Sequence, residues 1–553
     1  MSGEFWRVGH HYRDKAVVKF EDDELLRWRN TSAGSIANSG GIRVKDPASG
    51  GRVDTETGPP PLNSCSSGFV AASRGSSFKP DNARPPRLPS TAAPRNIDLQ
   101  GDLNGGNKTA MNWKDRVGNK LVDAEQSVAE IGSGAVVNIA PYTSTPMTLC
   151  TALKTHALKA GLRNIRIDHL ASPVSWTEPE FKGVFRLRDN YSTPPNRAAC
   201  HAGDSDYLPV GLWRSYELPA GMHPEPDFFL VPLSPPDARG YCSFGPGVWM
   251  SPTAARKAKR VIAEIQSDFI RTGGDNYIHI DQVDLFIEGH PSDASSSSAP
   301  QPNPDEVGQV EAICTMVAAE LINDGDTLQM GVGTVSASLG HFLDFRNDLG
   351  VQTELITSGI AELVQRGNIT GLRKSIHRGK VVGSALVSMP RAELEMINNN
   401  PTFELYDFGY TDDLRRLIQL ENFVAVNNAL AVDLTGQVAA EAFDHRPYTG
   451  VGGQTVFMLA GAYSTGGKSV SVLPSSSIPS SGGNRFTRIV SHHAPGTPIT
   501  VPRTYVDYVV TEFGIAELRG KTTAERARAM ISIAHPDFRD QLEDEAKRLY
   551  TLK

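Results

Sequence analysis

The chain has 553 residues and a formal net charge of -7; 39% of the residues are hydrophobic, 51 are glycine and 37 are proline. This length is sufficient for two or three domains with cores of their own, and the weak acidic charge gives no electrostatic basis for binding nucleic acid or an anionic membrane. Five scattered cysteines, an odd number without CxxC pairing, favour a reducing compartment over a disulfide framework.

The first 110 residues differ in composition from the rest. Glycine, proline, serine, asparagine and aspartate dominate residues 43–106, so this stretch cannot bury enough apolar surface to offset its ordering entropy. We predict a disordered extension over residues 1–110 and expect the functional protein to begin near Met111. The extension lacks the apolar core of a secretory signal, and acids such as Glu4 and Asp14 argue against a mitochondrial presequence. The expected location is the cytoplasm, with a mitochondrial one left open.

Residues 111–290 alternate between strand and helix patterns. A helical opening follows Met111. Strands are predicted at 135–139, 164–170, 228–232 and 260–265, and helices at 147–160 and 249–259. Such alternation predicts a mostly parallel sheet with helices on its faces.

A second alternating region follows a linker predicted at residues 291–309, which is rich in serine and proline. Over residues 310–553, strands are predicted at 327–330, 380–387, 423–427, 469–473 and 505–511, with helices at 311–322 and over most of 523–552. The predicted fold class is therefore α/β, with two open, mostly parallel α/β domains and a cleft between them.

One segment of the second region, residues 351–371, places an acid where a strand runs into an amphipathic helix. Glu354 lies at this junction, between Thr353 and Leu355, and Gly359 precedes the helix. Taken alone, Glu354 is most simply a turn or strand-edge acid.

Several glycine loops of the second region make a catalytic role for Glu354 more plausible. Residues 331–334 (GVGT), Gly359, residues 450–454 (GVGGQ) and residues 466–467 each follow a strand or precede a helix. Glycine lets backbone N–H groups approach a phosphate or a developing oxyanion, although any one such loop is usually an ordinary turn. No P-loop, GxSxG elbow or metal-binding spacing occurs. A lone carboxylate among such loops favours covalent catalysis by that carboxylate.

Ordered motifs in this chain resemble the acetyl-CoA hydrolase/transferase family, relatives of 4-hydroxybutyrate and succinyl-CoA:acetate CoA-transferases. They lie at residues 352–371, 426–443, 450–457, 466–477 and 509–539, and residues 234–245 (SPPDARGYCSFG) are similar to the family's substrate-domain segment. The resemblance runs from about Met111 to the C-terminus. It implies two open α/β domains of the CoA-transferase type, similar to sugar-phosphate isomerases, at residues 111–290 and 310–553.

The resemblance also implies a site and a reaction. Glu354 would be the nucleophile of a CoA-transferase, which moves CoA from an acyl-CoA to a small carboxylic acid through a glutamyl-CoA thioester. Five further residues would line the oxyanion and CoA site: Gly331, Gly333, Asn427, Gly452 and Gly453. Coenzyme A enters as a thioester substrate, and no metal or other cofactor is required. The expected partners are an acyl-CoA and a small carboxylate, without nucleic acid or membrane, in a homo-oligomer, expected to be a dimer.

Two alternatives stay open: an acyl-CoA hydrolase on the same site, which differs only in whether water reaches the intermediate, and a CoA-binding protein without turnover.

Three departures from the family pattern concern the pocket. Thr455 follows the GVGGQ loop where relatives commonly carry Asp, and Tyr142 stands in place of a glycine-rich run and would narrow the site. Residues 410–413 (YTDD) stand where many relatives carry Asn beside Pro, so Asp412 would raise the pKa of a neighbouring glutamate or repel an acid substrate.

Overall fold

The computed structural model describes residues 112–214, 225–289, 306–479 and 482–550. The predicted extension over residues 1–110 and most of the predicted linker lie outside these residues. We call residues 112–289 the N-terminal half and residues 306–550 the C-terminal half. Among the described residues, no helix combines the length and the apolar character needed to cross a bilayer.

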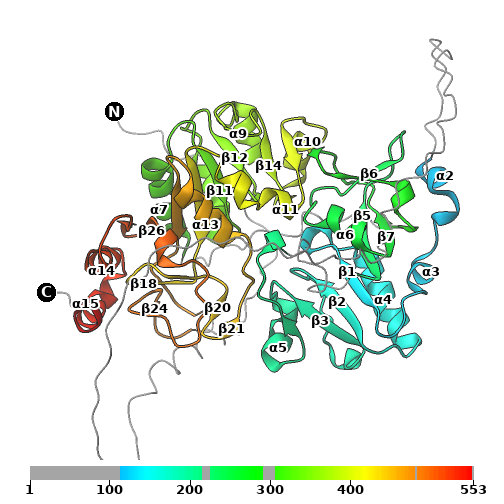
Figure 1. Ribbon diagram of the computed structural model, residues 1–553, viewed down its shortest axis with the longest axis horizontal. Helices are drawn as coiled ribbons and strands as arrows, with labels where there is room; N and C mark the ends of the chain where they lie inside the picture. The colour runs from blue at the N-terminus through cyan, green and yellow to red at the C-terminus, as the bar shows by residue number, and fades with distance from the viewer. Residues whose placement is uncertain (1–111, 215–224, 290–305, 480–481, 551–553) are drawn as a thin grey trace, which may run out of the picture. The chain divides into compact units, whose positions relative to one another are not determined.

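The N-terminal half is built on a fully parallel sheet of seven strands (Figure 1). Their order is β10 (Leu285–Glu288), β7 (Arg260–Ile265), β5 (Phe228–Leu233), β1 (Val136–Ile139), β2 (Ile165–His169), β3 (Phe185–Asp189) and β4 (Asp206–Tyr207). Every residue of β5 is buried, as expected for a central strand of a parallel sheet that is covered on both faces.

The helices of the N-terminal half are α2 (Trp113–Val117), α3 (Ala124–Val128), α4 (Met147–Lys159), α5 (Pro194–Ala202) and α6 (Ser251–Lys257). The single helical opening predicted after Met111 is two short helices. Gly118 takes a positive φ of 54° that ends α2, and Asp123 starts α3 with a capping box.

The C-terminal half carries a nine-stranded sheet that is parallel except at one edge. Its order is β27 (Gly514–Glu517), β26 (Tyr508–Thr511), β22 (Lys468–Val472), β17 (Phe423–Asn428), β11 (Thr327–Met330), β12 (Gly350–Gln352), β14 (Val381–Gly383), β16 (Phe403–Leu405) and β8 (Gly273–Gly274). The last strand, β8, comes from the N-terminal half and pairs with β16.

Short strands outside the two large sheets form small pairs. They are β6 (Tyr241–Ser243) with β9 (Tyr277–His279), β13 (Leu355–Ile356) with β15 (Ala385–Leu386), β18 (Ala431–Asp433) with β19 (Val438–Ala439) and β25 (Ile489–Val490), β20 (Ala442–Phe443) with β21 (Arg446–Pro447), and β23 (Ser476–Ser477) with β24 (Phe486–Thr487). One of these pairs corrects a prediction, because the strand expected at residues 380–387 is two strands, β14 and β15, in different sheets.

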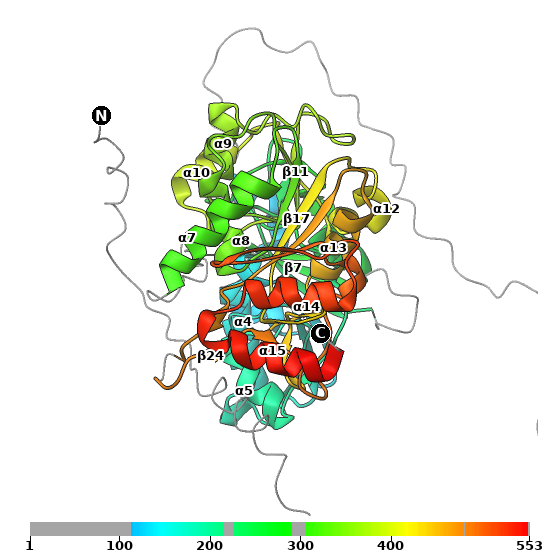
Figure 2. The same ribbon diagram turned by 90° about the vertical axis from the view of Figure 1, so that its left-hand side faces the viewer.

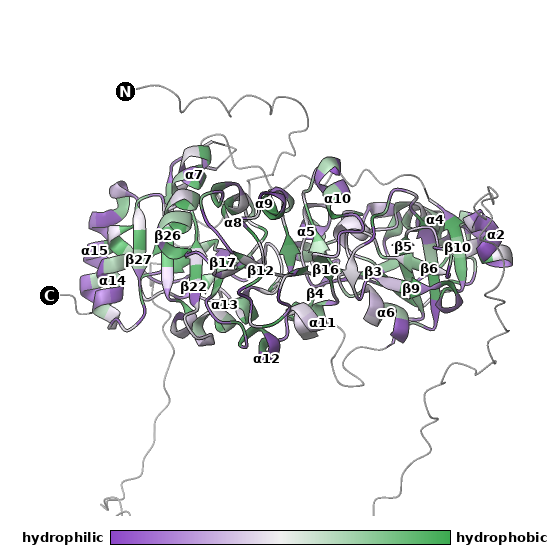
Figure 3. Cartoon of the chain, turned by 90° about the horizontal axis from the view of Figure 1, so that it is seen from above, coloured by the Kyte–Doolittle hydropathy of each residue, from purple (hydrophilic) through white to green (hydrophobic). Residues whose placement is uncertain are grey.

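The helices of the C-terminal half are α7 (Val307–Met316), α8 (Thr334–Ser338), α9 (Ile360–Arg366), α10 (Arg391–Ile397), α11 (Phe408–Thr411), α12 (Leu414–Leu417), α13 (Gln454–Tyr463), α14 (Thr523–Ser532) and α15 (Pro536–Tyr550). Helix α7 begins inside the range predicted as linker. Figure 2 shows α14 and α15 side by side, and Figure 3 shows mostly hydrophilic residues on α2 and α15. The two α/β sheets confirm the predicted fold class.

The order of the second sheet indicates where a ligand belongs. From β11 the chain proceeds to β12, β14 and β16 on one side, and later returns to β17, β22 and β26 on the other. The order reverses between β11 and β17, and ligands of open α/β sheets bind outside the carboxyl ends of the strands at such a point. The GVGT loop follows β11 at this edge, and Glu354 follows the next strand, β12.

Candidate functional site

Glu354 lies in a break between two strands. Strand β12 ends at Gln352 and pairs with β14, whereas β13 begins at Leu355 and pairs with β15. The Thr353 hydroxyl accepts from the Met330 N–H (3.4 Å) and donates to the Leu355 carbonyl (3.1 Å). The Ser384 N–H donates to the carbonyl of Glu354 (2.7 Å). These contacts fix the backbone of Glu354, while its side chain keeps partial access to solvent.

Gly453 places the start of helix α13 against this carboxylate. Gly453 is the N-cap residue of α13, and its N–H donates a hydrogen bond to the side chain of Glu354. A Cβ atom at position 453 would lie 2.2 Å from Glu354 Oε2. Only glycine lets the backbone come this close, so the GVGGQ loop brings a backbone N–H to the acid.

A second carboxyl group, that of Asp412, meets Glu354 at the same point. The position that a Cβ at Gly453 would occupy is 2.2 Å from Glu354 Oε2 and 2.7 Å from Asp412 Oδ2, so these oxygens are at most about 5 Å apart. The two side chains are hydrogen-bonded to each other, and Asp412 is fully buried at the C-terminal end of α11. We call Glu354 and Asp412 the carboxyl pair.

The carboxyl pair must share a proton. Burial raises the pKa of Glu354 to about 7, although hydrogen bonds from Asp412 and from the Gly453 N–H act in the opposite direction. Burial first, and then the proximity of Glu354, raise the pKa of Asp412 well above its ordinary value. Two carboxyl groups this close in a low dielectric do not ionise together. The fully buried Asp412 therefore holds the proton near neutral pH, and the more accessible Glu354 carries the charge.

The proton on Asp412 predicts that the stability difference between the wild type and Asp412→Asn depends on pH. Because the folded state holds a proton on Asp412 that the unfolded chain releases near pH 4, stability falls as pH rises from there. Asp412→Asn removes this loss and should raise the melting temperature, by roughly 2–4 °C at pH 8 and by less at pH 5, as followed by calorimetry. A gain that does not change between these pH values would contradict a shared proton.

Asp413 provides the matched comparison. Burial raises the pKa of Asp413, but hydrogen bonds from Arg415 outweigh it and hold this pKa below its ordinary value. The folded state therefore gains stability as Asp413 ionises, and Asp413→Asn should lower the melting temperature at pH 8.

The other residues predicted for the site lie at the same edge of the sheet. Gly331 directly follows β11, and Gly333 is the N-cap residue of α8, with no room for a Cβ beside Asn428. The side-chain amide of Asn427 exchanges two hydrogen bonds with Gln329 (3.1 and 2.7 Å). Asn427 therefore has a hydrogen-bond partner within the sheet. The contacts of Gly331, Gly333, Asn427 and Gly452 with CoA remain predictions.

The N-terminal half contributes residues that the sequence analysis missed. Trp249 accepts a hydrogen bond from the Ser384 hydroxyl at its carbonyl (3.2 Å), and its ring packs edge-on against that of Tyr142. Tyr191 lies against the GVGGQ loop, where a Cβ at Gly450 would meet its ring at 2.7 Å, and burial, then Glu354, raise its pKa to about 12. Tyr142 was singled out in the sequence, whereas Tyr191 and Trp249 follow no motif that predicts a contact across the two halves.

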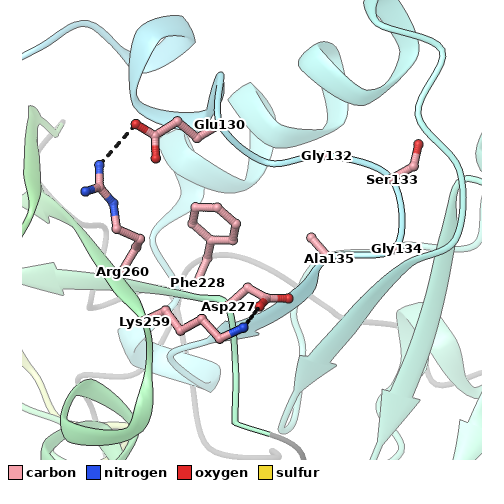
Figure 4. Close-up of a pocket in the computed structure, with 9 residues that line it drawn as sticks. All are labelled: Glu130, Gly132, Ser133, Gly134, Ala135, Asp227, Phe228, Lys259 and Arg260. Atoms are coloured by element: carbon pink, nitrogen blue, oxygen red, sulfur yellow. Dashed lines mark hydrogen bonds and ion pairs between the residues drawn. The ribbon is translucent and has the colours of Figure 1, made fainter.

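A hollow of about 360 Å³ lies elsewhere, at the amino ends of β1, β5 and β7 (Figure 4). Its charged residues already pair with one another: Lys259 with Asp227 (2.7 Å) and Arg260 with Glu130 (3.1 Å). Ligands of open α/β sheets bind at the carboxyl ends of the strands. This hollow is therefore not the candidate site.

Two family models match long stretches of this chain. Residues 107–293 match the family model of the acetyl-CoA hydrolase/transferase N-terminal domain, and residues 391–546 match that of its C-terminal domain. The 4-hydroxybutyrate coenzyme A transferase of Clostridium kluyveri is 34% identical over 442 residues, which cover 80% of this chain and 100% of that protein.

Two further proteins are similar over most of their length. The succinyl-CoA:acetate/propanoyl-CoA:succinate CoA transferase of Fasciola hepatica is 31% identical over 427 residues, covering 77% of this chain and 87% of that protein. The crystal structure of RipA from Yersinia pestis has a TM-score of 0.71 at 29% identity, covering 80% of this chain and 100% of that one.

Proposed function

Because the chain belongs to the acetyl-CoA hydrolase/transferase family, whose relatives named above include CoA-transferases, we propose that it moves coenzyme A from an acyl-CoA to a carboxylic acid through a thioester formed on Glu354. One observation carries the proposal. The carboxylate of Glu354 is held in a strand break at the carboxyl edge of the sheet, with the Gly453 N–H directed at it. A fixed carboxylate beside a backbone donor suits nucleophilic attack and stabilisation of the oxyanion that follows.

The first half of the reaction transfers the acyl group. The Glu354 carboxylate attacks the thioester carbonyl of the acyl-CoA, a C–O bond forms, and the C–S bond breaks to give a mixed anhydride and the CoA thiolate. The thiolate then attacks the carbonyl carbon of Glu354 and expels the first carboxylic acid as its anion. Glu354 now carries CoA as a thioester.

The second half reverses these steps with another carboxylate, which leaves as its CoA thioester. Water must be kept from both intermediates because it would hydrolyse either one. The contacts of Trp249 and Tyr191 from the N-terminal half provide an apolar cover beside Glu354. CoA bound away from the reacting carbon can contribute binding energy to each step.

Trapping the intermediate tests the proposal. The protein is incubated with an acyl-CoA without an acceptor, treated with borohydride, and digested for mass spectrometry. We expect a reduced side chain at Glu354, since borohydride reduces a thioester but not a free carboxylate. An unmodified Glu354, together with equal turnover by the Glu354→Ala variant, would overturn the proposal.

Acyl-CoA hydrolysis is the second candidate, and the buried Asp412 favours considering it. An ionised Asp412 would be a base beside the acylated Glu354, where it would be able to take a proton from water. A panel of carboxylate acceptors separates the two reactions. If the protein is a transferase, a new acyl-CoA forms only when a carboxylate acceptor is present. If it is a hydrolase, free CoA is released at the same rate with or without an acceptor.

A further inference from the structure

One oxygen of the carboxyl pair, Oδ2 of Asp412, has no role in the reaction proposed above. Asp412 is fully buried, and its Oδ1 accepts a hydrogen bond from the Thr411 hydroxyl (2.9 Å). Among the described residues, Oδ2 receives no hydrogen bond from an N–H or hydroxyl group. This oxygen and Glu354 Oε2 both lie beside the position that a Cβ atom at Gly453 would occupy, at 2.7 and 2.2 Å from it. A buried oxygen without a donor is costly unless it carries a proton and donates.

The reaction proposed above needs two hydrogen-bond donors where this oxygen lies. When the CoA thiolate attacks the acylated Glu354, negative charge develops on the carbonyl oxygen of that side chain. Oε2 is the oxygen held near Gly453 and Asp412, so it stays as the carbonyl oxygen while Oε1 bonds the acyl group. The Gly453 N–H supplies one donor, and a tetrahedral oxyanion is best stabilised by a second.

We propose that Asp412, in its protonated form, is a catalytic residue that donates the second hydrogen bond to the carbonyl oxygen of acylated Glu354. The inference rests on the function proposed above and deepens it. It assigns the oxyanion site of this chain to one backbone N–H at the start of α13 and one side-chain O–H at the end of α11.

The step balances without net proton transfer. The sulfur lone pair of the thiolate forms the C–S bond, and the π electrons of the carbonyl move onto Oε2, where the Asp412 O–H and the Gly453 N–H hold them. The C=O bond then re-forms and the C–O bond to the first acid breaks, which releases its carboxylate. Asp412 keeps its proton throughout, so the same residue serves the reverse half of the reaction.

The groups around Asp412 favour the protonated form. Asp407, at the N-cap of α11, raises the pKa of Asp412 further, after burial and Glu354. On α12, Arg415 and Arg416 both pair with Asp413. After burial, Glu354 also raises the pKa of Tyr191, whereas Tyr410 on α11 places its hydroxyl 2.6 Å from His377 Nε2.

The test is the pH dependence of transfer. In the wild type, kcat should rise as Glu354 ionises near pH 7 and fall again at alkaline pH as Asp412 loses its proton. Asp412→Asn keeps a donor at every pH, so its alkaline fall should disappear and its acid limb should move to lower pH. Asp412→Ala removes the donor and should lower kcat by roughly 10²–10³-fold with little change in KM.

Two measurements accompany the kinetics. Asp413→Asn, the same change one residue away, should keep the wild-type profile. Infrared difference spectra should show a protonated carboxyl band at neutral pH that Asp412→Asn lacks, and this readout does not depend on activity or on the alanine variant folding. Coincident profiles for the wild type and Asp412→Asn, or absence of the band, would overturn the inference. Adduct formation at Glu354, measured in parallel, decides the proposed function separately.

Discussion

Replacement of Glu354 by glutamine should abolish CoA transfer, with kcat lowered by roughly 10⁴-fold or more. Glutamine has nearly the same shape and can still accept the hydrogen bond from Gly453, but its amide cannot form the anhydride or the thioester. The measurement is acceptor-dependent CoA transfer at saturating acyl-CoA, with binding of the acyl-CoA followed separately. Binding should be retained, because the change removes chemistry and not the walls of the site.

Glu362 offers a matched control for this substitution. It lies on α9, one helical turn from Arg366, and pairs with that residue at 3.3 Å on the exposed side of the helix. Glu362→Gln makes the same chemical change outside the site and should keep full activity. If Glu354→Gln kept more than about a tenth of the wild-type rate, a covalent role for Glu354 would be untenable.

The second large effect is expected for Gly453→Ala. A methyl group at this position would meet Glu354 Oε2 at 2.2 Å, Asp412 Oδ2 at 2.7 Å and Phe457 Cε2 at 2.8 Å. The carboxyl pair or the start of α13 must move to accept it, and the donor then leaves the position of the oxyanion. We expect kcat to fall by roughly 10²–10³-fold and the pH profile to change with it. Stability should fall by about 1–3 kcal/mol from overpacking.

Gly308→Ala is the control for Gly453→Ala, because it adds the same methyl group to a helical glycine outside the site. Gly308 lies in α7, and a Cβ atom at this position would have no neighbouring atom within 4 Å. Gly308→Ala should leave kcat unchanged and raise stability slightly, since alanine favours a helix over glycine by about 0.5–1 kcal/mol. Equal activity of the two alanine variants would show that the approach of Gly453 to Glu354 is not required for the reaction.

Much of the fold was predictable because its strands are short apolar runs between clear turn signals. The strands at residues 260–265 and 327–330 were predicted with the bounds that they have. Errors occurred where local pattern does not decide pairing. Residues 380–387 (KVVGSALV) have the pattern of a single strand, yet Ser384 donates to the carbonyl of Glu354, and the strand divides between two sheets there. The sequence of a strand does not state which neighbour it pairs with.

The site was predictable to a similar degree. The motif that carries Glu354 and the glycines at 452–453 point to one reacting centre, and the structure places Gly453 and Asp412 beside Glu354. The sequence identified Asp412 only as a departure from the family pattern. Its contact with Glu354 joins residues that are far apart in the chain. Such a contact follows from the tertiary packing of α11, whose Phe408 ring lies against Trp249, and not from any local spacing.

The edge of the second sheet has a consequence for how the chain avoids misassembly. Glu404 and Leu405 of β16 pair with Gly273 and Gly274, so a segment of the N-terminal half occupies what would be an open strand edge. Open edges are templates for pairing with other molecules, and proteins guard them by covering or interrupting them. Here the covering strand is supplied from across the boundary between the halves. Because β8 precedes the C-terminal half in the sequence, it is synthesised first. It is therefore available to pair with β16 as the C-terminal half folds, which keeps this edge from pairing with another molecule.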